Sequence, residues 1–242
     1  MNSKKFSLVI RKPINSFKKK ITVDSDKSIS IRSFLLGSIS NGVSSVKNVL
    51  ESEDVFSTIT CLRKLNIKVF YQGNKTYKIF GKGLGSYKAK KMLKLNFGNS
   101  GTLARLIIGI ITSTPNIKLK ILGDKSLNKR SMKKLIDLMT KFGAEFFPKG
   151  KFFFPLTFSS TNYPIGISYN SGTSAQLKSA VILAGLNSYG DTEITENFES
   201  RDHTENMLMR NKRAIKITKS ATKKIKIFGK QYLDNFSIDV PG

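Results

Sequence analysis

The stretch SGTSAQLKSAVIL at residues 171–183 decides the fold, because small and hydroxyl-bearing residues run directly into an apolar helical segment. Similar stretches occur at 26–36, DKSISIRSFLL, and at 98–108, GNSGTLARLII. Three copies of one pattern indicate internal repeats, which reveal the architecture of a protein before any single motif is identified. We therefore expect related units, each with an apolar helix that begins at a small-residue loop.

Two series of residues give the repeat length. Three small residues are spaced by 73 positions, and each is followed four residues later by a cation: Ser28 and Arg32, Gly101 and Arg105, Ser174 and Lys178. Three serines are spaced by 74 positions: Ser52, Ser126 and Ser200. The shared period predicts βαβαββ units at about 21–94, 95–168 and 169–242, which together form one α/β (α+β) domain.

Each unit is expected to begin with a strand that precedes the helix-opening loop. Such strands are predicted in ITVDSD (21–26), KLNFGNSG (94–101) and GISYNSG (166–172). A second helix, clearest in MKKLIDLMTKFG (132–143), and two further strands complete the unit. The last residues, SIDVPG (237–242), have the character of another first strand, so we expect the chain to be the front part of a longer protein.

The chain is strongly basic, with 42 Lys and Arg against 16 Asp and Glu and a formal charge of +26. This charge favours phosphorylated metabolites, nucleic acid or an acidic membrane as partners, although a lysine-rich compositional drift would also produce it. The single cysteine, Cys61, excludes an intrachain disulfide and favours a reducing compartment, so we expect the cytoplasm. No apolar run approaches the roughly 18 residues of a membrane span, and we expect neither a targeting signal nor membrane association.

The repeated helix starts predict an anion site, because the first turn of a helix offers unpaired N–H groups and the positive end of the peptide dipole. Capping side chains and turn-forming glycines would explain any single loop without a ligand. Three loops in register favour phosphate or carboxylate binding. Neither a nucleotide-binding loop nor a metal cluster is expected, and His203 is interpreted as a helix-start residue satisfied by a neighbour, not as a general base.

Six successive motifs identify a resemblance that extends from about residue 8 to residue 242: KSISIR (27–32), LESEDV (50–55), FGNSGTLARL (97–106), GDKSLNKRSM (123–132), SGTSAQLKSAVILAGL (171–186) and ESRDHTENML (199–208). Together they resemble the 5-enolpyruvylshikimate-3-phosphate synthase family. The resemblance implies two similar domains that close around the substrates, each an inverse α/β barrel-like assembly of βαβαββ units. Residues 1–20 would then form a strand segment of the second domain, which is otherwise largely missing.

The resemblance also implies an activity and a set of contacts. The activity is transfer of the carboxyvinyl group of phosphoenolpyruvate to the 5-hydroxyl of shikimate 3-phosphate, with release of phosphate, in aromatic amino acid biosynthesis. Neither a metal nor an organic cofactor is implied, and the full-length enzyme is expected to be a monomer. Contacts to shikimate 3-phosphate are implied for Lys27, Ser28, Arg32, Ser174, Ala175, Gln176, Ser200 and Arg201. Contacts to phosphoenolpyruvate are implied for Lys27, Asn99, Gly101 and Arg130.

Two other functions stay open at this point. The charge motivates a basic nucleic-acid-binding module, although the positive residues are dispersed instead of interleaved with aromatics along one face. The second possibility is that the chain is an inert remnant of the enzyme and that its fold is incomplete.

The family's acid and base residues lie in its second domain, so we expect no catalytic residue in this sequence. Excluding water and orienting two substrates by domain closure also requires both domains. We therefore expect the 242-residue chain alone to show no significant turnover. A coupled phosphate-release assay checks this, and normal turnover by the isolated chain would contradict it.

Overall fold

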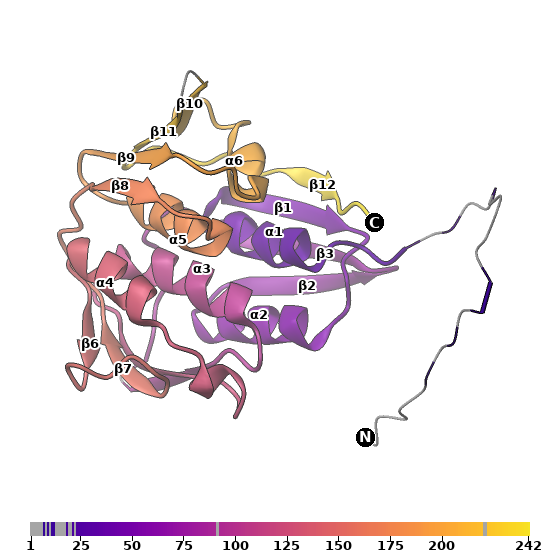
Figure 1. Ribbon diagram of the computed structural model, residues 1–242, viewed down its shortest axis with the longest axis horizontal. Coiled ribbons are helices and arrows are strands. Elements are labelled where there is room, and N and C mark those ends of the chain that lie inside the picture. Colours follow the sequence, from indigo (N-terminus) through magenta and orange to yellow (C-terminus); the bar gives the residue numbers. More distant parts are fainter. Residues whose placement is uncertain are drawn as a thin grey trace.

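A computed structural model describes residues 23–90, 92–219 and 222–242, together with six isolated positions before residue 22. The strand segment expected at 1–20 therefore lies outside the described residues apart from those isolated positions. The described chain has three sheets around a central group of helices (Figure 1). Among the described residues, no helix combines the length and apolarity needed to cross a membrane.

The helices fall into an inner and an outer set. The inner helices are α1 (Lys27–Ile39), α3 (Gly101–Thr112) and α5 (Ala175–Gly185). The outer helices are α2 (Glu53–Lys64), α4 (Lys133–Lys141) and the short α6 (His203–Leu208), with a 3₁₀ turn at Leu127–Lys129. Figure 1 shows α1, α3 and α5 side by side in the middle of the molecule, with the strands around them.

The three sheets share one strand order. The first consists of β12 (Ser237–Asp239), β1 (Asn41–Lys47), β3 (Thr76–Lys82) and β2 (Lys68–Gly73). The second consists of β4 (Leu93–Asn96), β5 (Lys118–Leu122), β7 (Leu156–Ser159) and β6 (Glu145–Phe147). The third consists of β8 (Ser168–Ser171), β9 (Asp191–Glu196), β11 (Lys223–Phe228) and β10 (Ile215–Lys219).

In every sheet the first pair of strands in this order is parallel and the other two pairs are antiparallel. The parallel pairs β4–β5 and β8–β9 are each linked by an inner helix, as the long crossover between parallel strands requires. The α/β architecture of repeated βαβαββ units around inner helices is therefore confirmed.

The first sheet differs from the sequence expectation. Residues 23–26 form no strand, although ITVDSD was predicted to supply the first strand of this unit. That position is taken by β12, which pairs in parallel with β1 through Ser45 and Ser237. The strand predicted in SIDVPG is present as β12, and it completes the first unit's sheet. Asp26 N–H also donates to Pro241 O at 2.8 Å, which joins the start of α1 to the same segment.

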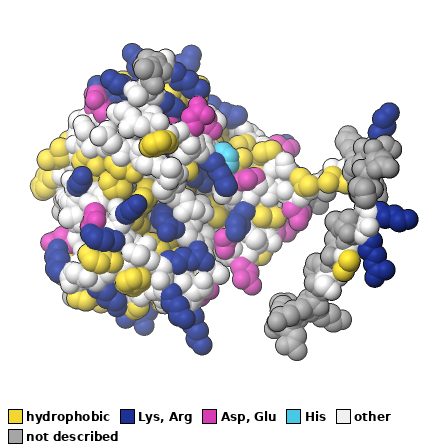
Figure 2. Space-filling view, in the orientation of Figure 1, with side chains coloured by type: hydrophobic (Ala, Val, Ile, Leu, Met, Phe, Trp, Pro, Cys, Tyr) yellow, Lys and Arg dark blue, Asp and Glu magenta, His cyan; other side chains and the backbone are white. Residues whose placement is uncertain are grey.

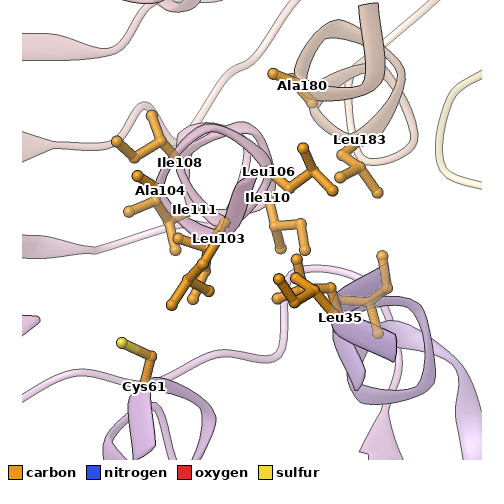
Figure 3. Close-up of a cluster of buried hydrophobic side chains, with 14 of the residues drawn as sticks. Leu35, Cys61, Leu103, Ala104, Leu106, Ile108, Ile110, Ile111, Ala180 and Leu183 are labelled. Atoms are coloured by element: carbon orange, nitrogen blue, oxygen red, sulfur yellow. The ribbon is translucent and has the colours of Figure 1, made fainter. Parts of the chain in front are cut away.

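The central position of α3 follows from its sequence, GTLARLIIGIIT, which is apolar on every side apart from Arg105 and two threonine hydroxyls. A helix that is apolar all round is stable only when it is buried all round. Leu103, Leu106 and Ile107 are fully buried, and Figure 3 shows side chains of α1, α2 and α5 packed around this helix. The inner helices thus form the core and leave only their ends for a polar site.

Gly109 brings α3 into close contact with α5. A Cβ atom at this position would lie 2.5 Å from Ala180 O and 3.0 Å from Ala180 Cα. Because these are backbone atoms of a buried helix, they cannot move aside as a flexible side chain would. The two helices are close enough for their first turns to share side-chain hydrogen bonds.

We predict that Gly109→Ala destabilises the chain by about 1–3 kcal/mol, because the added methyl group overpacks the α3–α5 contact. At an unobstructed helical position the same change stabilises by about 1 kcal/mol, so the sign of the effect is diagnostic. Urea denaturation measures the free energy of unfolding. Gly172→Ala is the control, since a Cβ there meets nothing within 4 Å. A more stable Gly109→Ala variant would contradict the close contact.

Candidate functional site

The first turns of the three inner helices meet at one end of the molecule. Their N-caps are Asp26, Ser100 and Ser174, and each cap side chain accepts a hydrogen bond from the backbone N–H three residues later. Gln176 Nε2 donates to Thr102 Oγ1 at 3.0 Å, which joins α5 to α3. Arg32 Nη2 donates to Ser179 Oγ at 3.2 Å, which joins α1 to α5. Three positive helix ends therefore converge, and this favours a bound anion.

A cavity of about 460 Å³ opens at this convergence. Its lining residues are Ser28, Arg32, Thr173, Ser174, Ala175, Gln176, Glu199, Ser200, Arg201 and His203. Every residue expected to contact shikimate 3-phosphate lines this cavity except Lys27. The structure therefore brings together positions that are up to 173 residues apart in sequence.

Arg32 is the buried cation of this cavity, with 3% of its surface exposed. Its guanidinium donates to Thr204 Oγ1 at 2.8 Å, to Ser179 Oγ at 3.2 Å and to Ser28 O at 3.2 Å. Burial lowers the pKa of Arg32, and Glu205 opposes that effect. Because its three partners are neutral, the charge of Arg32 is not neutralised by a direct ion pair among the described residues, and an anion in the cavity would supply the missing countercharge.

Ser200 and Arg201 follow β9 in a loop that ends at α6. The backbone N–H and the hydroxyl of Ser200 both donate to Glu196 Oε1, at 3.0 and 2.7 Å. Both donors of Ser200 are therefore bonded to Glu196, although Ser200 lines the cavity in which it is expected to contact shikimate 3-phosphate. Arg201 is exposed and makes no ion pair with the described residues, so its guanidinium is free to bind an anion.

A second polar group surrounds the start of α3. Arg130 Nη2 donates to Asn99 Oδ1 at 2.8 Å and to Ser126 Oγ at 3.3 Å. A Cβ at Gly101 would lie 2.8 Å from Arg105 Nη1 and 3.4 Å from Arg130 Nη1, so this glycine leaves room for the Arg105 guanidinium, while Arg130 lies at ordinary contact distance. The expected phosphoenolpyruvate contacts Asn99, Gly101 and Arg130 thus lie together.

Lys27, the remaining predicted contact, stands at the first position of α1. Its ammonium group forms an ion pair with Asp54 Oδ2 at 3.0 Å, and half of its side chain is exposed. Asp54 lies in the first turn of α2, inside the LESEDV motif. Asp54 was not predicted as a site residue, although its position inside the LESEDV motif could have indicated that it lies near the substrates.

Arg105 connects the two groups. Its Nη1 donates to Gln176 Oε1 at 2.9 Å and to Gly101 O at 3.0 Å. Burial and then the charge of Arg130 lower the pKa of Arg105. A neighbouring cavity of about 450 Å³ is lined by Arg105, Ser174 and Gln176 together with residues 131–135 and Leu177. Arg105 belonged to the cation series, but it was not among the residues assigned to the site.

The third cation of that series does not face the site. Lys178 is fully buried, and its ammonium group lies 2.7 Å from Glu196 Oε1 and 2.6 Å from Glu205 Oε1. The expectation of a cation from each inner helix at one anion site is therefore wrong for α5. The reason is local: the two carboxylates neutralise Lys178 before any ligand arrives.

His203 is the first residue of α6, so its interpretation as a helix-start residue is confirmed, and it lines the cavity at the converging helix starts. Its Nδ1 atom is buried without a hydrogen-bond partner among the described residues, so the expected satisfaction by a neighbour is wrong. In the described part of the chain, no group of three or more His, Cys, Asp or Glu side chains is placed to hold a metal ion.

Comparisons with known proteins agree with the geometry. The family model described as EPSP synthase (3-phosphoshikimate 1-carboxyvinyltransferase) matches residues 11–242. A 3-phosphoshikimate 1-carboxyvinyltransferase of Bacillus cytotoxicus is 41% identical over 226 residues, which cover 92% of this chain and 51% of that protein. The enzyme of the same name from Bacillus subtilis is 39% identical over 96% of this chain and 53% of its own length. The chain thus spans about half the length of these curated relatives.

Among solved structures, too, this chain matches about half of a longer enzyme. The EPSP synthase of Acinetobacter baumannii has a TM-score of 0.82 and 34% identity, and the match covers 93% of this chain and 50% of that chain. The enolpyruvyl transferase NikO of Streptomyces tendae has a TM-score of 0.67 at 12% identity, which shows a shared fold alone. The chain belongs to the EPSP synthase (3-phosphoshikimate 1-carboxyvinyltransferase) family.

Proposed function

We propose that this chain binds shikimate 3-phosphate and phosphoenolpyruvate as part of an enzyme that transfers the carboxyvinyl group between them and releases phosphate. The observation that carries the proposal is the cavity at the converging helix starts, which is lined by all but one of the residues expected to hold shikimate 3-phosphate. Both substrates are anions, and the cavity walls contain guanidinium groups without carboxylate partners among the described residues.

Shikimate 3-phosphate is assigned to the 460 Å³ cavity. Its phosphate would meet Arg32 and Arg201, and its hydroxyl-bearing ring would meet the polar side chains of Ser174 and Gln176. A guanidinium offers a planar pair of donors that matches phosphate oxygens, which a lysine ammonium does not. Because Arg32 is held by three neutral acceptors, it is fixed in place before the ligand binds.

Phosphoenolpyruvate is assigned to the neighbouring group of Asn99, Gly101 and Arg130, with Lys27 reaching both substrates. The carboxyvinyl transfer requires protonation of the methylene group, removal of the proton from the attacking hydroxyl, and positive charge near the departing phosphate. Lys27 and Arg130 are proposed to supply the charge. Gln176, which bonds to Arg105 and Thr102, fixes the wall between the two substrates.

The remaining assignments concern the chain as a whole. Residues 21–242 are proposed to form the substrate-binding domain, with units at about 21–94, 95–168 and 169–242, of which the last supplies β12 to the sheet of the first. Residues 1–20 are proposed to belong with the second domain. We further propose a cytoplasmic enzyme that is monomeric at full length and has no nucleic-acid partner. Figure 2 supports the absence of a nucleic-acid partner, since Lys and Arg side chains are scattered over the face that it shows, with Asp and Glu side chains among them.

Arg201→Met is expected to weaken binding of shikimate 3-phosphate about tenfold or more, because it removes a charged donor to the phosphate. Binding is measured by isothermal titration and by the rise in melting temperature that a native-state ligand produces. Arg213→Met is the matched control, since Arg213 is also exposed and does not line the cavity. No binding to the wild-type chain, or equal binding to both variants, would contradict the proposed site.

Arg130→Lys is expected to weaken phosphoenolpyruvate binding about tenfold in the presence of saturating shikimate 3-phosphate. The lysine keeps the charge but loses the paired donors that now bond Asn99 and Ser126. The reverse exchange at the adjacent exposed position, Lys129→Arg, is the control and should leave the affinity unchanged. Equal affinities for the two variants would argue against phosphoenolpyruvate at Arg130.

A further inference from the structure

The loop at residues 197–202 is bonded to α6 at Asp202, and among the described residues its preceding part is held through Ser200. It connects β9 to α6 and carries Ser200 and Arg201 to the cavity at the converging helix starts. Among the described residues, the hydrogen bonds that tie positions 197–201 to the protein are the two from Ser200 to Glu196 Oε1. Phe198 in the same loop is 64% exposed, so apolar packing contributes little to its position.

Glu196 belongs to a buried cluster of four charged side chains. Lys178 contacts both Glu196 and Glu205, at 2.7 and 2.6 Å. Lys223 does the same from β11, at 3.0 Å from Glu196 Oε2 and 3.7 Å from Glu205 Oε1. The side chains of Lys178, Glu196 and Glu205 are at most 1% exposed, and that of Lys223 is 15% exposed.

The cluster joins the two ends of the loop. Glu196 is the last residue of β9, just before the loop, and Glu205 lies in α6, just after it. Two lysines contact both carboxylates, so the ends of the loop are linked through four ion pairs. The charges of the cluster balance, which is the condition under which buried ions are tolerated.

The same cluster reaches Arg32 through Thr204, the neighbour of Glu205. Thr204 Oγ1 accepts from Arg32 Nε at 2.8 Å and bonds Ser179 Oγ at 2.8 Å. The position of α6 therefore helps to set the position of Arg32. Arg201 on the loop and Arg32 on α1 line the same cavity.

Glu196 stays a carboxylate under ordinary conditions. Burial alone would raise its pKa, but hydrogen bonds from Lys178, Ser200 and Lys223 outweigh this effect and hold the pKa at about 2. Its Oε1 atom can therefore accept from Lys178 Nζ, from Ser200 N and from Ser200 Oγ together.

We propose that Glu196 is a positioning residue for anion binding, which holds Ser200 so that Arg201 faces the cavity opposite Arg32. The proposal rests on the proposed function for its ligand, shikimate 3-phosphate. Glu196 does not touch the ligand. Lys178 and Lys223 supply the countercharge that lets a carboxylate serve as the buried anchor, and Glu205 balances the second ammonium group.

Two double variants separate positioning from general stability. Glu196→Leu with Lys223→Met leaves the neutral pair of Lys178 and Glu205 and removes the oxygen atom that accepts both hydrogen bonds from Ser200. Glu205→Leu with Lys223→Met leaves the neutral pair of Lys178 and Glu196 and keeps the acceptor for Ser200. The variants contain the same kinds of substitution and differ only in which carboxylate remains, so the loss of buried charge is matched.

Amide hydrogen exchange of the 197–203 segment and titration with shikimate 3-phosphate are measured on the full 242-residue chain. We expect exchange at Ser200 to become several-fold faster in the Glu196 variant and to stay near wild type in the Glu205 variant. We expect the affinity to fall on the order of tenfold in the first and to stay within about threefold in the second. The ³¹P signal of the bound ligand should move only in the first.

The outcomes distinguish this inference from the proposed function. If the wild-type chain does not bind shikimate 3-phosphate, the proposed function fails. The proposed role of Glu196 in anion binding then fails as well, even if hydrogen exchange shows that Glu196 holds Ser200 in place. If the wild type binds but both variants bind and exchange alike, the proposed function stands and the inference is overturned. Should the Glu196 variant fail to fold, Ser200→Ala keeps all four charges and removes one anchoring bond. Unchanged exchange at residue 200 in that variant would overturn the inference.

Discussion

The contact between α3 and α5 constrains the rest of the molecule. Gly109 allows the two helices to approach until a side-chain carbon would collide with the backbone at Ala180. At this separation Gln176 on α5 reaches Thr102 and Arg105 on α3. A close apolar packing near the C-terminal half of α3 therefore determines a polar arrangement at its N-terminal end.

The repeat places equivalent residues at equivalent positions, but their neighbours give them different chemistry. Arg32 and Arg105 both lie in the second turns of inner helices and have neutral hydrogen-bond acceptors, so their charge remains available. Lys178 occupies the corresponding position on α5 and is surrounded by Glu196, Glu205 and apolar core. Lys178 thus stabilises the third unit, while Arg32 and Arg105 line cavities.

The period of the sequence predicted the inner helices, the strands that follow them and the meeting of their first turns, because each of these depends on local pattern and on repetition. The motifs also predicted most of the cavity lining. The partners of Lys178 and Ser200 could not be predicted, since both depend on where the side chain of Glu196 points after folding. The source of the first strand of the first sheet could not be predicted either, because 21–26 and 237–242 carry similar patterns and only tertiary pairing chooses between them.

The pairing of β12 with β1 has a consequence for synthesis of the protein. A ribosome delivers β1 almost 200 residues before β12, so the nascent first unit has a sheet with one edge of β1 unpaired throughout that interval. An unpaired edge strand is a template for association with other chains. This edge of β1 can therefore be covered by β12 only after the segment around Ile238 has been synthesised.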